Sequence, residues 1–315
     1  MKKVTVLLLK VLFVCCILSQ SVRAEGNFVE SDLFGLLKKG EKAALLVVHF
    51  GTTHEDTRIR TIDAVNRKLA DAFPGIEVRE AWTSRIVMHR MKAQGIEKKA
   101  PGEVLEQLKA EGYTHVLIQS SNIIDGVEME SLREEAVAYG PYFKEIRVGI
   151  PLLYSPEDYE AVITAVSSLS SLGGDNGASV LLVGHGTYMP NTAQYAMLDY
   201  MLKAKGLTHW SVGTIEGYPS FDEALSMLKK ESGKIVRLIP FMFVAGEHAK
   251  NDIAVDWKDE LEKQGYQVEV LMEGLGENPA IQDIVVRHAR FCATHKYLDI
   301  AKKKKEYAQG KEKYE

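Results

Sequence analysis

Apolar residues follow two kinds of spacing along the chain, and together they predict strands alternating with helices. Residues 43–50 form an almost continuous apolar run ending at Gly51, which is typical of a strand buried on both faces of a parallel sheet. Apolar positions then recur at helical spacing from Ile59 to Phe73 and stop at Pro74-Gly75. This order of strand, turn and amphipathic helix predicts one βα unit.

The same order of elements occurs twice. Further strands are expected in the first part at residues 76–81, 116–120 and 146–150, with helical patterns between them. A second apolar run at 179–184 ends in His185-Gly186-Thr187 and is followed by expected strands at 212–215 and 235–239. The sequence therefore predicts an α/β fold of two similar parallel-sheet lobes, made by internal duplication, with a cleft between them.

The pattern also predicts where the chain divides. We expect an export signal at 1–24, an N-terminal α/β lobe at 25–160 and a C-terminal α/β lobe with the metal site at 161–280. Residues 281–315 are expected to form a closing helix, which packs back on the first half, and a charged tail. A stretch of Gly, Asp and Asn residues at 173–177 is typical of a linker.

The first residues resemble a secretory signal. Lys2 and Lys3 precede a mostly apolar stretch at 4–18, and Val22-Arg23-Ala24 fits a cleavage site. The apolar stretch is interrupted by Lys10 and is shorter than the roughly 20 residues that a spanning helix needs. We therefore expect cleavage near Ala24, an exported, periplasmic protein, and no membrane span in the mature chain.

The amino-acid composition restricts the partners and the metal ligands that the chain can have. A formal charge of -4 and a pI near 6.2 provide no general basic field, which argues against a nucleic-acid partner. Cys15 and Cys16 lie in the signal segment, so the mature chain keeps Cys292 alone and cannot form an internal disulfide. Thiolate-rich zinc and iron–sulfur sites are excluded as well, so a metal must bind to imidazole and carboxylate groups.

Superimposing the two halves on their motifs identifies the candidate site. His185-Gly186-Thr187 aligns with 50–52, and 244–248 aligns with 124–128. In this alignment Glu216 lies opposite Trp82, so the second half has His185, Glu216 and His248 where the first has Phe50, Trp82 and a glutamate. Residues just past the carboxyl ends of parallel strands meet at one edge of a sheet, so we expect these three polar side chains to converge.

Two neutral imidazoles and a carboxylate suit Co²⁺, Ni²⁺, Fe²⁺ or Zn²⁺ and leave coordination positions open for transfer. A single histidine after a strand is more often structural, but the duplication and the second histidine favour ligands. Other histidines are expected to be structural or exposed, namely His49, His54 and His89.

Four motifs taken together resemble the anaerobic sirohydrochlorin cobaltochelatase family. They are 45–52 (LLVVHFGT), 184–186 (GHG), 244–252 (VAGEHAKND) and 274–281 (GLGENPAI), and the similarity runs in order from about 42 to about 290. The resemblance implies a bilobal chelatase fold and insertion of a divalent metal, most simply cobalt, into a tetrapyrrole. It also implies that the metal-handling histidines are His185 and His248 and that the active-site glutamate is Glu216.

Several points stay open at this stage. Phe50 and Trp82 are candidates for an apolar wall against the flat macrocycle, although aromatic residues more often belong to a core. Some relatives have a histidine where this chain has Asn122, which bears on metal choice. The alternative function is an exported metal- or haem-binding protein that acts in transport without turnover. Haem binding and a homo-oligomer are both left open.

Overall fold

The computed structural model describes residues 27–35, 37–169 and 177–310, which fall into two compact units. The larger unit, Leu33–Ala293, contains both lobes. The expected export signal and most of the expected linker lie outside the described residues.

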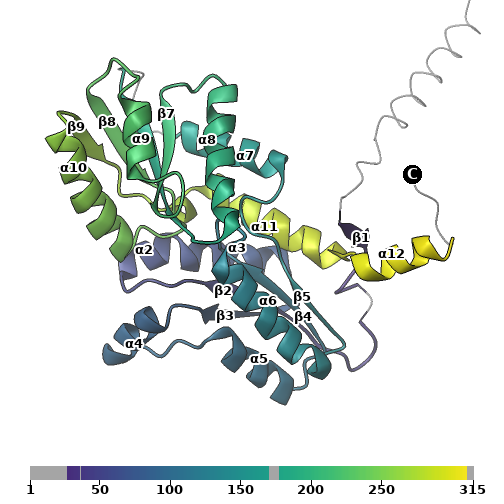
Figure 1. The fold of residues 1–315 in the computed structure, drawn as a ribbon. Coiled ribbons are helices and arrows are strands. Elements are labelled where there is room, and N and C mark those ends of the chain that lie inside the picture. Colours follow the sequence, from purple (N-terminus) through teal and green to yellow (C-terminus); the bar gives the residue numbers. More distant parts are fainter. Residues whose placement is uncertain (1–26, 36, 170–176, 311–315) are drawn as a thin grey trace, which may run out of the picture. The chain divides into compact units, whose positions relative to one another are not determined.

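The first lobe is built on a four-stranded parallel sheet of order β3-β2-β4-β5 (Figure 1). Its strands are β2 (Ala43–His49), β3 (Glu77–Trp82), β4 (His115–Ser120) and β5 (Glu145–Val148). The central strand β2 is buried along its whole length, because helices cover both faces of the sheet. Its helices are α2 (Glu55–Arg60), α3 (Ile62–Ala72), α4 (Arg85–Ala93), α5 (Pro101–Ala110) and α6 (Val127–Tyr139), followed by the short η1 (Gly140–Tyr142).

The second lobe repeats this architecture with the sheet order β7-β6-β8-β9, again all parallel. Its strands are β6 (Ser179–Gly186), β7 (Trp210–Glu216), β8 (Ile235–Pro240) and β9 (Gln267–Val270). Its helices are α7 (Pro156–Ser167), η3 (Pro190–Thr192), α8 (Ala193–Ala204), α9 (Phe221–Leu228), the π-helix η4 (Ala249–Trp257), α10 (Lys258–Lys263) and η5 (Leu275–Glu277). The predicted α/β fold of two similar parallel-sheet lobes is confirmed.

Alternation along β6 explains why this apolar run forms a central strand. Val180 and Leu182 pack into a core with α7 and α8, whereas Leu181 and Val183 pack into a second core with α9 and α10. Successive side chains of a strand point to opposite faces, so the run of four apolar residues from Val180 to Val183 supplies both layers. Burying a side chain of this size contributes roughly 1.5–3 kcal/mol.

Strand register defines which residues of the two halves are equivalent. Val48 pairs with Ser120, and Val183 pairs with Pro240 at the same place in the other sheet. Counting onward from these pairs makes Gly126 equivalent to Gly246, as the motif alignment predicts.

The helix α7 connects the lobes and belongs to the core of the second. The expected domain boundary at 160/161 falls inside it, and its buried residues share a core with β6, α8 and β7. Ser155 and Asp158 begin the helix with a reciprocal capping box, in which each side chain accepts a hydrogen bond from the other residue's backbone N–H.

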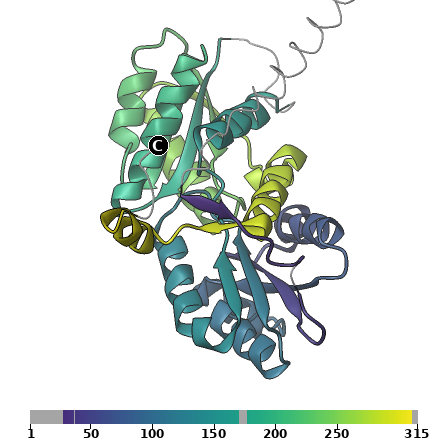
Figure 2. The same ribbon diagram turned by 90° about the vertical axis from the view of Figure 1, so that its right-hand side faces the viewer.

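The closing helix is α11 (Pro279–Thr294), which contacts both lobes (Figure 2). In the first lobe, Lys68 pairs with Asp283 at 2.6 Å, and the buried Arg147 donates to the carbonyl of Cys292 at 3.0 Å. In the second, Asp158 of α7 accepts a hydrogen bond from His288. Cys292 is buried in this helix, and burial raises the pKa of its thiol to about 11.

The smaller unit joins segments from the two ends of the described chain. β1 (Phe28–Glu30) pairs antiparallel with β10 (His295–Tyr297), and α12 (Ile300–Ala308) follows. Residues 300–308 of the expected charged tail are therefore helical, and α12 buries none of its side chains. Across residues 27–310, apart from position 36 and the gap at 170–176, no helix has both the length and the apolar character to cross a membrane.

Candidate active site

His185 lies at the carboxyl end of the central strand β6, and Gly186 follows it in the left-handed region with φ 86°. Gly186 pairs with Glu216, the last residue of β7. A Cβ atom at position 186 would lie 1.6 Å from the carbonyl oxygen of Glu216, so only glycine permits this approach. The glycine thus sets the spacing between the strands that carry His185 and Glu216.

His248 follows β8 and forms the N-terminal cap position of η4. Its Nδ1 lies 2.6 Å from Oδ2 of Asp252. The imidazole is 47% exposed, so it is not enclosed in a dry core.

The two histidines, far apart in the sequence, lie next to each other. Their ring centroids are 4.7 Å apart, and the rings meet edge to face at 88°. His185 is partly buried, with Nδ1 3.4 Å from the carbonyl oxygen of Gly186. Both imidazoles therefore have Nδ1 near an acceptor, which leaves Nε2 of each ring as the available metal donor.

Glu216 lies beside this pair through its strand pairing, one residue from His185 in the register. The phenol of the exposed Tyr188 forms a hydrogen bond with Glu216, and the negative charge of the carboxylate raises the pKa of Tyr188. Within the described part of the chain, no group of three or more His, Cys, Asp or Glu side chains is arranged to hold a metal ion. The role of Glu216 as a third ligand or base stays a prediction.

The structure corrects the placement of Trp82. Trp82 pairs with His49 in the sheet, and His49 is equivalent to Gly184, whose partner is Thr214. The residue equivalent to Glu216 is therefore Ser84, two positions further on. Trp82 is fully buried behind Gly51 and offers no face to a substrate, whereas Phe50 is 39% exposed. Trp82 therefore cannot belong to the expected aromatic wall, whereas Phe50 in that wall stays a prediction.

The three histidines expected to be structural or exposed, His49, His54 and His89, lie in three different environments. His49 is buried between Ser121 and Asn66, each 2.9 Å away, and burial lowers the pKa of its imidazole. Nε2 of His54 lies 3.0 Å from Oε1 of Glu247. Because Glu247 precedes His248, this contact joins the first lobe to the candidate site, a role that the sequence analysis missed. His89 is exposed on α4.

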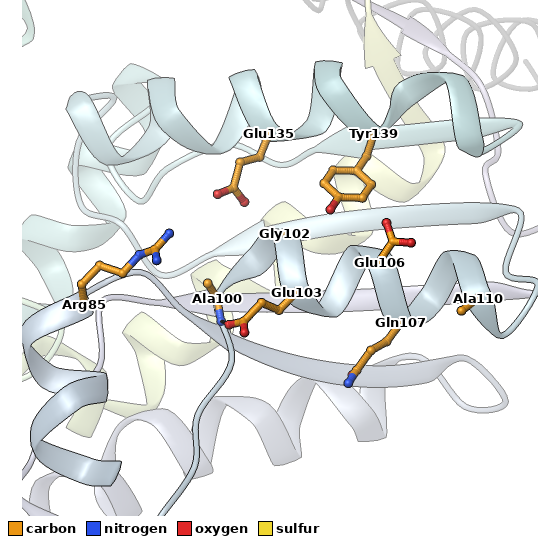
Figure 3. Close-up of a pocket in the computed structure, with 9 residues that line it drawn as sticks. All are labelled: Arg85, Ala100, Gly102, Glu103, Glu106, Gln107, Ala110, Glu135 and Tyr139. Carbon is orange, nitrogen blue, oxygen red and sulfur yellow. Dashed lines mark hydrogen bonds between the residues drawn. The ribbon is translucent and has the colours of Figure 1, made fainter. Parts of the chain in front are cut away.

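The first lobe contains a cavity of about 710 Å³ between α5 and α6 (Figure 3). Glu135 and Tyr139 project from α6 towards α5, and Arg85 enters from the start of α4. Burial raises the pKa of Glu135. The residues lining this cavity include no histidine or cysteine, so it does not resemble the donor set at positions 185 and 248.

Fold and site together define a two-lobed α/β protein with paired imidazoles at the carboxyl ends of its second sheet. Residues 43–293 match the family model described as cobalt chelatase (CbiK). The chain belongs to this family.

Two curated relatives agree with the match. The sirohydrochlorin cobaltochelatase of Salmonella typhimurium is 38% identical over 253 residues, covering 78% of this chain and 95% of that protein. Sirohydrochlorin cobaltochelatase CbiKC of Nitratidesulfovibrio vulgaris is 30% identical over 253 residues, covering 78% and 89%.

The fold is similar to that of a solved structure described as SirB from Bacillus subtilis with Fe³⁺. The TM-score is 0.59 at 16% identity, covering 80% of this chain and 96% of that one. The structure of the sirohydrochlorin chelatase SirB of Bacillus subtilis subspecies spizizenii in complex with cobalt gives 0.54 at 16% identity, covering 80% and 95%.

Proposed function

We propose that this protein is a sirohydrochlorin cobaltochelatase, which inserts Co²⁺ into sirohydrochlorin and releases two protons. The observation that carries the proposal is the adjacent pair His185 and His248, with ring centroids 4.7 Å apart, in a chain of the cobalt chelatase family. Both curated relatives are named as sirohydrochlorin cobaltochelatases, which favours turnover over a receptor that only holds metal or haem.

The chemistry follows from the two imidazoles. A neutral imidazole binds a divalent ion through its lone pair, and two such donors leave positions on the ion for the pyrrole nitrogens. Once an imidazole has released the ion, it can accept a proton from a pyrrole N–H, and Glu216 supplies a further base beside His185. The metal is a substrate, and neither it nor the macrocycle changes oxidation state, so no redox cofactor is required.

The test is an insertion assay with the purified mature protein, sirohydrochlorin and Co²⁺, followed through the tetrapyrrole absorption. We expect many equivalents of product per protein molecule at substoichiometric protein. Conversion that stops at one equivalent would contradict the proposal and support a binding protein. Parallel reactions with Fe²⁺ and Ni²⁺ identify the preferred metal, since these donors suit all three ions.

We also propose that the protein acts outside the cytoplasm. The support is the sequence pattern of 1–24, with two lysines, an apolar stretch and Val22-Arg23-Ala24. Expression of the full chain in a Gram-negative host, followed by fractionation and N-terminal sequencing, tests the proposal. We expect a periplasmic protein that begins at Glu25, and an uncleaved cytoplasmic product would contradict it.

A further inference from the structure

We propose that Asp252 is a positioning residue for metal transfer, acting through His248 rather than binding the ion itself. This inference rests on the proposed function, in which His248 is a metal donor. Asp252 has no role assigned by the sequence motifs, and its carboxylate lies 2.6 Å from Nδ1 of His248.

The contact decides which ring nitrogen carries the proton. A carboxylate can only accept a hydrogen bond, so Nδ1 of His248 must donate and the lone pair of the neutral ring is on Nε2. Metal-binding histidines are commonly oriented in this way by a carboxylate on the other nitrogen, which also makes the ring a stronger donor. Asp252 therefore fixes both the tautomer and the direction of His248.

The second histidine is held less firmly. Nδ1 of His185 lies 3.4 Å from the carbonyl oxygen of Gly186, a longer contact to a neutral acceptor. The pair is thus asymmetric, with one imidazole fixed by an anion and the other held weakly. If both imidazoles bind one ion, His248 is expected to be the donor whose position changes less.

The π-helix η4 explains why Asp252 can hold this position. Ala249, Ile253 and Trp257 of η4 are buried in the second lobe's core, whereas Asp252 lies on the other face, 30% exposed. Packing of the buried side chains fixes the backbone that carries Asp252. Wide helical turns of this kind occur frequently at functional sites.

The neighbouring carboxylate of Glu247 has different contacts from that of Asp252. It faces His54 at 3.0 Å and Arg90 at 3.9 Å, so it contacts the first lobe. Within residues 27–310, the gaps excepted, no three candidate ligands are grouped to hold an ion, so Asp252 is not assigned to a preformed ligand set with the two histidines.

The test compares Asp252→Ala with Asp256→Ala, which removes an exposed carboxylate from the same π-helix. Calorimetric titration with Co²⁺ alone measures affinity, and ¹⁵N NMR of the histidine rings reports the tautomer of His248. We expect Asp252→Ala to weaken Co²⁺ binding about 10- to 100-fold and to populate the Nε2–H form. Asp256→Ala should leave both readouts at the wild-type values.

Asp252→Asn provides a graded version of the test. The amide oxygen still accepts from Nδ1–H but without a charge, so affinity should fall between wild type and Asp252→Ala. Wild-type Co²⁺ affinity in Asp252→Ala, or an Nε2–H tautomer in the wild type, would overturn the proposal. Neither readout requires turnover, so failure of the insertion assay in the wild type would overturn the proposed function separately.

Discussion

At the scale of single residues, the spacing of the candidate ligands depends on a glycine. Gly186 has φ 86°, and a Cβ atom there would lie 1.6 Å from the carbonyl oxygen of Glu216. Gly206 has nearly the same φ, 84°, but nothing lies within 4 Å of a Cβ atom at that position. The two glycines separate the cost of a left-handed backbone from the cost of a steric overlap.

We therefore predict that Gly186→Ala is much more destabilising than Gly206→Ala. The second substitution should cost only the roughly 1–2 kcal/mol of a left-handed alanine, whereas the first must also push β6 away from β7. Urea unfolding of both variants measures the difference, and Co²⁺ titration should show lost affinity in Gly186→Ala alone. Equal free energies of unfolding would contradict this account of the site.

The residue His248 provides the most direct test of the active site. His248→Ala should lower the rate of metal insertion by at least about 100-fold, as loss of a proton-transfer group commonly does, while the half-exposed position leaves the fold intact. The control is His209→Ala, which removes an imidazole next to the amino end of β7, at the other end of that strand from Glu216. Wild-type rates in His248→Ala would refute the assignment.

At the scale of elements, α7 and α11 are joined through a buried carboxylate. Asp158 lies 2.8 Å from Nε2 of His288 and 2.7 Å from Arg287, and it also caps α7. Burial alone would raise the pKa of Asp158, but the hydrogen bond and charge of His288 and the bonds from Ser155 lower it to about 2. The ionised carboxylate therefore stabilises the contact between the helices.

This shift predicts a specific loss of stability in acid. Because the folded pKa is about 2 and the ordinary value is 3.8, Asp158 contributes about 2 kcal/mol above pH 4. The contribution disappears as the pH falls through the folded pKa. Urea unfolding from pH 7 to pH 2 should therefore show a shallower acid decline for Asp158→Asn. Asp283→Asn, at an exposed position of α11, should follow the wild type.

Elements also show what the sequence could and could not predict. The apolar runs of β2 and β6 identified the central strands, because both faces of each are buried. The predicted equivalence of Trp82 and Glu216 was wrong by two residues. Moving an alignment by two residues leaves every side chain of a strand on the same face of the sheet, so the apolar pattern does not reveal the error. Only the observed strand pairing reveals it. Ser84 could not be recognised without that register.

Three further elements, η4, β1 and β10, were missed for physical reasons. The apolar residues Ala249, Ile253 and Trp257 recur every four positions, which also fits an ordinary α-helix, so the π-helix left no distinct pattern. β1 and β10 have three residues each and pair across almost the whole chain, so no local pattern predicts their pairing. The convergence of His185 and His248 was predicted correctly, because carboxyl ends of parallel strands meet at one edge.

At the scale of the whole larger unit, the two lobes make reciprocal contacts. A Cβ atom at Gly246 would lie 3.6 Å from Oγ1 of Thr52, and one at the equivalent Gly126 would lie 3.8 Å from Oγ1 of Thr187. Thr52 and Thr187 are themselves equivalent by the motif alignment, so each half offers the same surface to the other. This exchange of identical contacts is what a two-fold relation between repeats produces.

The shared core predicts that the lobes unfold together. Ile124 and Leu153, from loops that follow strands of the first lobe, pack in one cluster with Val180 and Leu198 of the second. Trp82 lies in the first lobe, whereas both other tryptophans lie in the second. In Trp82→Phe, fluorescence therefore reports the second lobe, and its urea midpoint should coincide with that of far-UV circular dichroism. Separate midpoints would show independent lobes.

Because the architecture is duplicated, the first lobe has positions equivalent to the three candidate metal donors of the second. Phe50, Ser84 and Glu128 occupy the places of His185, Glu216 and His248, behind a Gly51 that shares the left-handed conformation of Gly186. Placing histidine at 50 and 128 and glutamate at 84 would therefore give the first lobe the same candidate donor set as the second, a defined engineering route to a protein with two such sets.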